Sequence, residues 1–234
     1  MNTVNIEATD LPDLWFQSLH ALVSKGRRFK IDSGSYAGEE RIELDYFTAN
    51  VKYPGAKPLL PNIPHHLGIP NPVDLKYIEG GEGIERSYVE YIMSNNIADN
   101  EEYTYGDRLV GSKRSLPNID QVSQVILSYK VKGHRSNQNI MQVGKIEDLF
   151  LMDPPCLRHI DTRIQDNKLH FFIYFRSWEA WAGLPANLAG IQYLKEFMAS
   201  EIGVLDGEMV VASKGLHIYG HAEEIARIRV GKKT

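Results

Sequence analysis

Residues 168–176 read KLHFFIYFR, a run in which strand-forming residues alternate along the chain. Leu169, Phe171, Ile173 and Phe175 form one set of alternate positions. The other set also carries aromatic rings, at Phe172 and Tyr174, so we expect both faces of this strand to be buried. The run ends on Arg176, and a charge at the end of an apolar strand is costly unless it is paired. An anionic ligand and a structural ion pair would each satisfy this arginine.

The segments around this strand mix helices and strands without the regular alternation of a parallel β/α fold. Residues 187–202 give the clearest helix, because apolar residues recur on one face and Gly203 follows as a stop. Residues 11–25 give another, which Gly26 ends. Together the segments predict an α+β fold. Further helices are expected at 84–97 and 118–129, and further strands at 42–53, 139–143, 208–213 and 216–219.

The composition of the 234 residues is that of a globular protein with a formal net charge of −4. This acidic balance gives no reason to expect a nucleic acid or an anionic membrane as a partner. No run of about 18 apolar residues occurs and no charged leader follows Met1, so we expect a soluble, unprocessed protein. A single cysteine forms no internal disulfide and suits the cytoplasm.

Two local clusters allow both a functional and an ordinary interpretation. His65 and His66 are adjacent, and adjacent side chains rarely converge on one ion, so we expect no metal site. Four basic residues surround a Gly/Ser turn at 33–35, which could hold a phosphate or simply form a solvated hairpin tip. Their spacing matches no nucleotide-binding fingerprint. The four are Arg27, Arg28, Lys30 and Arg41.

The only cysteine, Cys156, follows two prolines in a tight turn between strand-like segments. An unpaired cysteine is most often a small, inert, buried residue. A nucleophilic cysteine needs a nearby cation that favours the thiolate. Arg176 or His217 could supply that cation, so both an inert and a catalytic role remain open at this stage.

Four motifs follow one another over about 65 residues, and the ordered set resembles the signature of the thymidylate synthases. Tyr105-Gly106 resembles a further element of that family, and Glu90 lies where the family has a helix glutamate. The short chain is similar to the archaeal members. The four motifs are Pro154-Pro155-Cys156, Arg176-Ser177-x-Glu179, Gly183-Leu184-Pro185-x-Asn187-x-Ala189 and His217-x-Tyr219.

The resemblance implies that the protein is an enzyme that converts dUMP to dTMP. The Cys156 thiolate would add to C6 of the uracil ring, which makes C5 nucleophilic toward the methylene carbon of a reduced pterin. The donor would be 5,10-methylenetetrahydrofolate or a methylene-tetrahydromethanopterin. Glu90 would assist proton movement through ordered water, and Tyr105 would help to remove the C5 proton.

The other matched residues would bind dUMP. By the resemblance, Arg176 and Ser177 hold the phosphate, and the Arg176 charge also favours the thiolate. Asn187 would donate to O4 and accept from N3–H of the uracil. His217 and Tyr219 would hold the ribose hydroxyl.

The pterin contacts implied by the resemblance rest on fewer residues. Glu179 stands where the family has an aspartate that contacts the pterin. Trp178 and Trp181 would wall the pterin pocket, but aromatic packing in the core is an equal alternative for both.

The family further implies one three-layer domain over residues 1–234, with a large mixed sheet flanked by helices and one sheet face used for a homodimer. Family members also lend paired arginines to the partner's phosphate, and here the corresponding region offers Arg135 alone. Leu157 and Phe175 replace a histidine and a glutamine of the family pattern. Other cations could therefore serve the phosphate, with Arg41 and Arg108 as candidates.

Three alternatives to thymidylate synthesis remain. A dUMP or dCMP hydroxymethylase of the same family would trap the same intermediate with water, although asparagine at 187 favours uracil over cytosine. A non-catalytic nucleotide-binding protein would keep the pocket without needing Cys156. A cysteine hydrolase would use Cys156 with His217, but the sequence shows no oxyanion-loop pattern.

Overall fold

The computed structural model describes residues 1–32, 36–63, 86–99, 101–112 and 118–232. Three features of the sequence lie outside these ranges: the Gly/Ser turn at 33–35, the adjacent histidines at 65 and 66, and the start of the helix expected from residue 84. The described part of that helix is a short α2 (Tyr88–Met93), capped by the Ser87 side chain.

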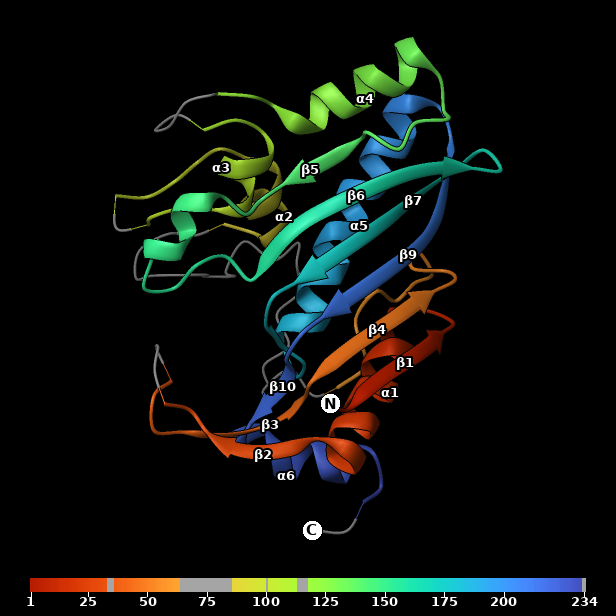
Figure 1. The fold of residues 1–234 in the computed structure, drawn as a ribbon. Coiled ribbons are helices and arrows are strands. Elements are labelled where there is room, and N and C mark those ends of the chain that lie inside the picture. The colour runs from red at the N-terminus through yellow and green to blue at the C-terminus, as the bar shows by residue number, and fades with distance from the viewer. Residues whose placement is uncertain (33–35, 64–85, 100, 113–117, 233–234) are drawn as a thin grey trace.

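A large mixed sheet runs through the molecule, in the order β1-β4-β9-β7-β6-β5 (Figure 1). β1 pairs with β4 in parallel, as β9 does with β7, and the other neighbours pair in antiparallel fashion. The α+β prediction with a mixed sheet is confirmed. The strands are β1 (Thr3–Ala8), β4 (Tyr46–Val51), β5 (Ile140–Gln142), β6 (Leu157–Gln165), β7 (Lys168–Phe175) and β9 (Leu205–Ser213).

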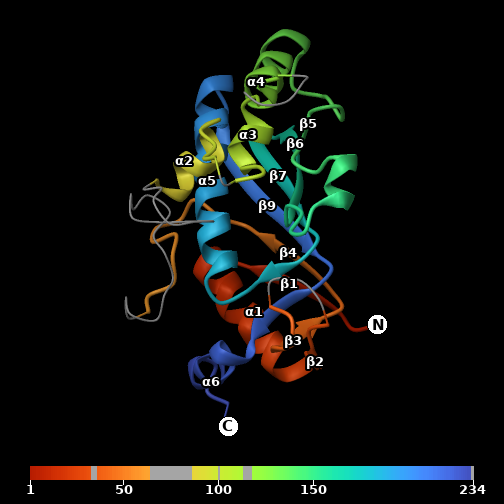
Figure 2. The same cartoon turned by 90° about the vertical axis from the view of Figure 1, so that its left-hand side faces the viewer.

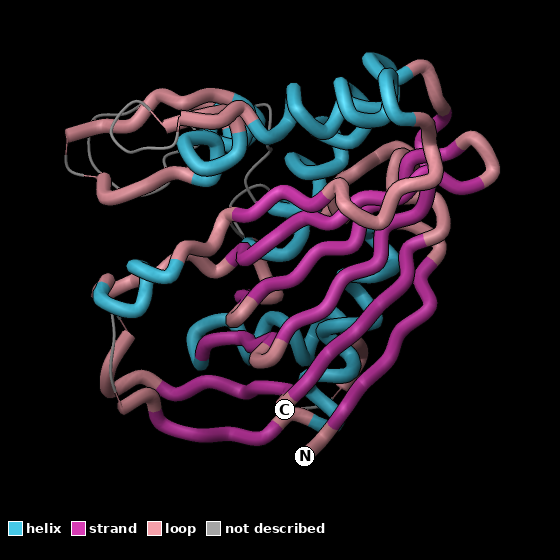
Figure 3. The backbone as a smooth tube through the Cα atoms, turned by 45° about the horizontal axis from the view of Figure 1, so that its top comes forward, coloured by secondary structure: helices cyan, strands magenta, loops and turns pink. Residues whose placement is uncertain are grey.

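A smaller sheet with the order β2-β3-β10-β8 lies beside the large one (Figures 1 and 3). The single strand expected over 42–53 is wrong, because the chain bends at Asp45 and enters the other sheet. The Asp45 carboxylate accepts hydrogen bonds from the Asn2 backbone and the Arg27 side chain, which hold that bend. The strands are β2 (Arg27–Lys30), β3 (Glu40–Leu44), β8 (Trp178–Glu179) and β10 (Leu216–Tyr219).

The two strongest predicted helices are present. Helix α1 is capped by the Asp10 side chain, and it ends before Gly26, as expected. Helix α5 starts four residues before its predicted start and ends at Gly203, whose φ of 87° lies in the left-handed region. None of the helices in the described ranges is long and apolar enough to cross a membrane. The helices are α1 (Leu11–Lys25), α3 (Tyr105–Leu109), α4 (Gln121–Lys132), η2 (Ile146–Phe150, a 3₁₀ helix), α5 (Gly183–Ile202) and α6 (Gly220–Arg229).

Helices cover one face of the large sheet. α1 and α5 pack against it, and α2 packs on the far side of α5, which makes three layers (Figure 2). The inward side chains of β7 are buried, whereas Phe172 and Tyr174 on the opposite face are half-buried. Among the described residues no helix covers that face, so the expected burial of both faces is not met within one chain.

Burial of α5 against the sheet makes a direct test of the packing possible. Leu194 on α5 is fully buried, whereas Leu127 on α4 is 52% exposed. We expect Leu194→Ala to lower the free energy of unfolding by about 2–5 kcal/mol, because it leaves a cavity. Leu127→Ala, a matched helical substitution, should cost under about 1 kcal/mol. Urea denaturation of both variants measures this, and equal losses would contradict the packing described.

Candidate active site

A cavity of about 560 Å³ lies where the end of β7 meets the smaller sheet. Seven of its lining residues belong to the sequence motifs: Pro154, Cys156, Arg176, Ser177, Glu179, His217 and Tyr219. They line it together with the β2–β3 hairpin and the segment that precedes Cys156. The lining residues are Ile31, Tyr36, Arg41, Leu151, Met152, Asp153, Pro154, Cys156, Arg176, Ser177, Glu179, His217 and Tyr219.

The register of β6 against β7 brings Cys156 next to Arg176. Leu157 pairs with Phe175. Cys156 precedes Leu157 and Arg176 follows Phe175, so these two residues are neighbours at the same end of the sheet. The Arg176 backbone N–H donates to the Cys156 carbonyl at 2.8 Å. The Leu157 N–H donates to the Tyr105 hydroxyl at 3.3 Å, which places that phenol beside the cysteine. Cys156 itself is half-buried and borders the cavity.

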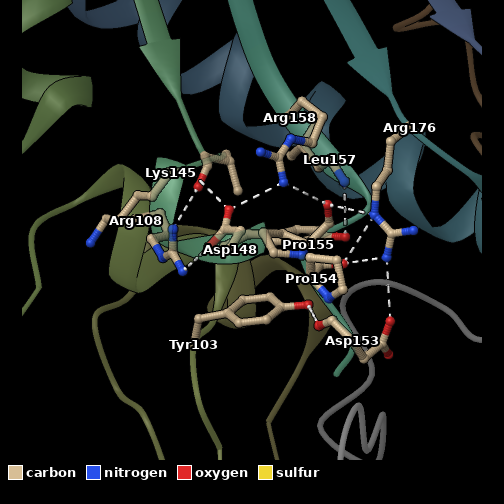
Figure 4. A network of polar contacts seen from close by, with 12 residues as sticks. Tyr103, Arg108, Lys145, Asp148, Asp153, Pro154, Pro155, Leu157, Arg158 and Arg176 are labelled. Atoms are coloured by element: carbon tan, nitrogen blue, oxygen red, sulfur yellow. Dashed lines mark hydrogen bonds and ion pairs between the residues drawn. The ribbon is translucent and has the colours of Figure 1, made fainter. Parts of the chain in front are cut away.

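The guanidinium of Arg176 holds the turn that carries the cysteine (Figure 4). Its Nε donates to the Pro154 carbonyl at 3.2 Å and to the Pro155 carbonyl at 3.3 Å. Its Nη2 donates to the Pro154 carbonyl and to Asp153 Oδ1. Within the described residues Nη1 has no hydrogen-bond partner, so this cation can still receive an anion. Arg176 can thus form the structural ion pair with Asp153 and still bind an anionic ligand.

Arg41 brings a second cation to the cavity. It pairs with Glu43 at 2.8 Å, while its buried Nε has no hydrogen-bond partner among the described residues. Arg108, the other candidate, instead donates to Asp148 and to the Val143 carbonyl and does not line the cavity. Arg27 and Arg28 are paired with carboxylates, as in an ordinary hairpin.

His217 presents a hydrogen-bond acceptor to the cavity. Its Nδ1 lies 2.9 Å from the Gly215 carbonyl, and a carbonyl only accepts, so Nδ1 carries the proton and Nε2 is the acceptor. This Nε2 is buried without a partner among the described residues. Burial lowers the pKa of His217 to about 4, so the ring is neutral at pH 7.

Tyr219 lies beside His217, with ring centroids 4.9 Å apart. Its own ring stacks on Tyr36 at 4.3 Å. Burial raises the pKa of Tyr219, so the phenol keeps its proton and can donate it in a hydrogen bond. The His/Tyr pair therefore offers one acceptor and one donor side by side.

The Glu179 carboxylate lies at the start of α5. It accepts hydrogen bonds from the backbone N–H groups of Trp181, Ala182 and Gly183 at 2.6–2.8 Å. Burial raises the pKa of Glu179, and these three N–H groups oppose that shift. The side chain borders the cavity, yet its oxygens already cap the helix.

Trp178 and Asn187 are buried and are not among the residues that line this cavity. The Trp178 ring is buried and stacks on Phe175 with centroids 4.2 Å apart, which is the core packing offered as the alternative for this residue. Its Nε1 donates to Asn187 Oδ1 at 3.0 Å, and Asn187 Nδ2 donates to the Tyr88 hydroxyl at 2.8 Å. Trp181 is also buried, against Trp15.

The two remaining candidates lie away from the cavity. Glu90 on α2 is half-buried and is not among the lining residues. Arg135 lines a different hollow beside the β6–β7 turn. Since all nine residues of β6 separate that turn from Cys156, the two lie roughly 30 Å apart. In the described ranges no three His, Cys, Asp or Glu side chains lie close enough to hold a metal ion.

The cavity brings together a thiol, two guanidinium groups and a neutral histidine acceptor, groups that can bind an anionic ligand with a hydroxyl group. The family model described as "Thymidylate synthase" matches residues 88–233, so the chain belongs to the thymidylate synthase family.

Individual relatives match most of the chain. One from Methanosarcina mazei is 29% identical over 218 residues, which are 92% of this chain and 89% of the relative. One from Methanothermobacter thermautotrophicus is 26% identical over 231 residues, which are 95% of this chain and 98% of the relative. Both carry the name "Putative thymidylate synthase".

Several residues of the site belong to none of the sequence motifs. Tyr36 stacks on Tyr219, and Leu151 and Met152 border the cavity next to the cysteine turn. Arg158 also contacts this turn, by a hydrogen bond to the Pro155 carbonyl. Only the position of Arg158, two residues after Cys156, could have signalled its role.

The low pKa of His217 predicts a specific pH dependence of stability. The unfolded histidine titrates near 6.5 and the folded one near 4. The unfolded state therefore binds more protons between these values, and stability falls as the pH drops from about 6.5 to about 4. We expect this residue to account for about 3 kcal/mol of the loss between pH 7 and pH 4. Urea denaturation should show a correspondingly weaker loss in His217→Asn, and identical pH profiles would contradict the assignment.

Proposed function

We propose that the protein methylates dUMP at C5 to give dTMP, with the whole chain acting as one catalytic domain in the cytoplasm. The observation that carries this proposal is the meeting of five motif residues on one cavity. Cys156, Arg176, Ser177, His217 and Tyr219 come from separate strands and turns and all line it. Family membership supports the reaction class.

The polar groups of the cavity suit the parts of dUMP. The phosphate would bind at Arg176 and Ser177, with Arg41 as a second cation, because guanidinium groups match phosphate oxygens. The ribose hydroxyl would donate to His217 Nε2 and accept from the Tyr219 hydroxyl.

Asn187 retains the right groups for the uracil edge. Its amide offers two N–H donors and two acceptor lone pairs. Tyr88 takes one donor and Trp178 takes one lone pair. One donor remains for O4 and one acceptor for N3–H. The hydrogen bonds to Trp178 and Tyr88 would thus fix the orientation of the Asn187 amide that recognises the base.

The proposed chemistry starts at the sulfur. The Cys156 thiolate forms a bond to C6, and the electron pair of the C5=C6 bond becomes available at C5. C5 then bonds to the methylene carbon of the pterin. Loss of the C5 proton breaks the pterin–carbon bond, hydride from the pterin completes the methyl group, and the thiolate leaves. Tyr105 lies beside the cysteine turn and would help to remove this proton, and Glu90 would act at a distance through water.

The pterin would enter on the side of Leu151 and Met152, which border the cavity with apolar surface. The Glu179 carboxylate would contact the pterin only through the lone pairs that do not accept hydrogen bonds from the first turn of α5. Trp178 is buried and would act indirectly, through its hydrogen bond to Asn187. A folate and a methanopterin derivative fit this description equally, so the donor is proposed by class: a methylene-carrying reduced pterin. No metal takes part in the proposed steps.

A homodimer would cover the open face of the large sheet. That face has a hollow of about 400 Å³ whose lining includes Phe172, Tyr174 and Val210. Aromatic and aliphatic side chains exposed together in this way are typical of an interface between protein chains. Arg135, far from its own cavity, would then act on the phosphate bound by the partner.

The nucleophile is tested by Cys156→Ser. We expect turnover, followed as tritium release from dUMP labelled at C5, to fall by at least about 1,000-fold, because the serine hydroxyl is a far weaker nucleophile at neutral pH. Calorimetry should show dUMP binding within about threefold of the wild type, which controls for folding. The product mass separates a methyl from a hydroxymethyl group. Unchanged turnover would refute the role of the thiol.

The dimer is tested by Tyr174→Glu on the open sheet face. Light scattering should give about 53 kDa for the wild type, twice the chain mass of 26.6 kDa, and the chain mass itself for the variant. The reason is that a buried carboxylate without a partner destabilises an interface. Leu127→Glu on exposed α4 serves as the control and should remain dimeric. A wild type of one chain mass at micromolar concentration would contradict the interface.

A further inference from the structure

A buried carboxylate on η2 connects to the cysteine turn through arginine side chains (Figure 4). Asp148 Oδ1 accepts from Arg108 Nη2 at 2.8 Å, and Oδ2 accepts from Arg158 Nη1 at 3.1 Å and from the Lys145 backbone N–H at 2.7 Å. The Asp148 side chain is only 3% exposed. Burial alone would raise the pKa of Asp148, but these donors hold it below its ordinary value, so the carboxylate is charged.

Arg158 carries this connection to the residue before the nucleophile. The same Nη1 that contacts Asp148 donates to the Pro155 carbonyl at 3.3 Å. Arg176 Nε donates to that carbonyl as well, also at 3.3 Å. One carbonyl therefore receives hydrogen bonds from two arginines, Arg158 on β6 and Arg176 directly after the end of β7. Since this carbonyl belongs to the peptide that joins Pro155 to Cys156, its orientation sets the direction of the cysteine side chain.

Gly144 provides the space for this arrangement. A Cβ atom at residue 144 would lie 2.4–2.6 Å from the guanidinium atoms of Arg158. The backbone N–H groups of Val143 and Gly144 both donate to the Arg158 carbonyl. The guanidinium thus lies flat over a glycine, between Asp148 and Pro155, and a methyl group at residue 144 would displace it without changing any charge.

We propose that Asp148 and Arg158 are positioning residues for Cys156: through the hydrogen bond to the Pro155 carbonyl they hold the thiol in its reactive orientation. We call Asp148, Arg158 and this carbonyl the loop brace. The catalytic part of this inference rests on the proposed function, because it concerns the step in which the sulfur bonds to C6. Substrate affinity depends on other groups, so the loop brace acts on the chemical step rather than on dUMP binding.

Three variants disturb the loop brace in different ways. Arg158→Met removes the donor and keeps the length of the side chain. Asp148→Asn keeps the shape but turns an amide donor or a weaker acceptor toward the arginines. Gly144→Ala displaces the Arg158 guanidinium without adding or removing a charged group. Lys195→Met is the matched control, because Lys195 is also a buried cation that pairs with an aspartate and donates to backbone carbonyls, here those of Gly207 and Glu208 on β9.

Two measurements decide the proposal. We expect all three variants to lower kcat by about 10- to 100-fold, since a small misplacement of a reacting group costs this much. KM for dUMP should stay within about threefold. Hydrogen–deuterium exchange of the peptide covering residues 151–158 should be at least about 10-fold faster. Lys195→Met should lower the melting temperature without changing kcat or this exchange, and Arg158→Lys should recover part of kcat.

Two results would overturn the loop brace: unchanged kcat in the three variants, or opposite effects of Arg158→Met and Asp148→Asn, which would indicate a simple charge effect. Failure of the proposed function is a separate outcome. If the wild type does not turn over dUMP, that function fails, while the exchange measurement still decides whether the loop brace holds the cysteine turn.

Discussion

The site depends on the hydrogen bonds between the Arg176 guanidinium and the carbonyls of Pro154 and Pro155. Prolines have no N–H to satisfy, so their carbonyls are the polar groups that this turn must pair. Arg176 satisfies them from the end of a buried strand and still has Nη1 directed away from the turn. One side chain thereby fixes the cysteine turn and supplies positive charge next to it.

The two sheets create the cavity around this interaction. β7 ends in the large sheet, and after two intervening residues the chain enters β8 of the smaller sheet, beside β10 with His217 and Tyr219. β3, which pairs with β10, adds Arg41 opposite Tyr219. The two arginines, the His217/Tyr219 pair and the thiol therefore come from different parts of the chain and line one cavity at the junction of the sheets.

The sequence predicts the elements whose pattern is local and regular. α1, α5 and β7 follow from periodic apolar residues with clear caps, and the ordered motifs place the cavity residues. The bend at Asp45 could not be predicted, because its partners Asn2 and Arg27 are distant in sequence. β6 was not assigned, since a bulge between Leu157 and His159 interrupts its alternation.

The positions of polar side chains depend still more on tertiary structure. The sequence gives Asn187 and Glu179 as candidate ligand contacts, but only the fold shows that one is oriented by Trp178 and Tyr88 and the other caps α5. The pairing of Asp148 with Arg158 is similarly invisible in the sequence, because the partners lie on separate elements. The sequence motifs indicate which residues are candidates for the site, and the tertiary structure determines the hydrogen-bond partners of each one.

The central claim is that the Cys156 sulfur bonds to the pyrimidine of dUMP. It is tested most directly with a dUMP analogue that carries fluorine at C5, because the step that removes the C5 proton is then blocked and the bound state cannot proceed. After incubation with this analogue and a methylene-carrying reduced pterin, intact-protein mass spectrometry should show the chain mass plus one analogue and one donor. Peptide mapping should locate the addition on Cys156. An unmodified chain, or an adduct on another residue, would contradict the account.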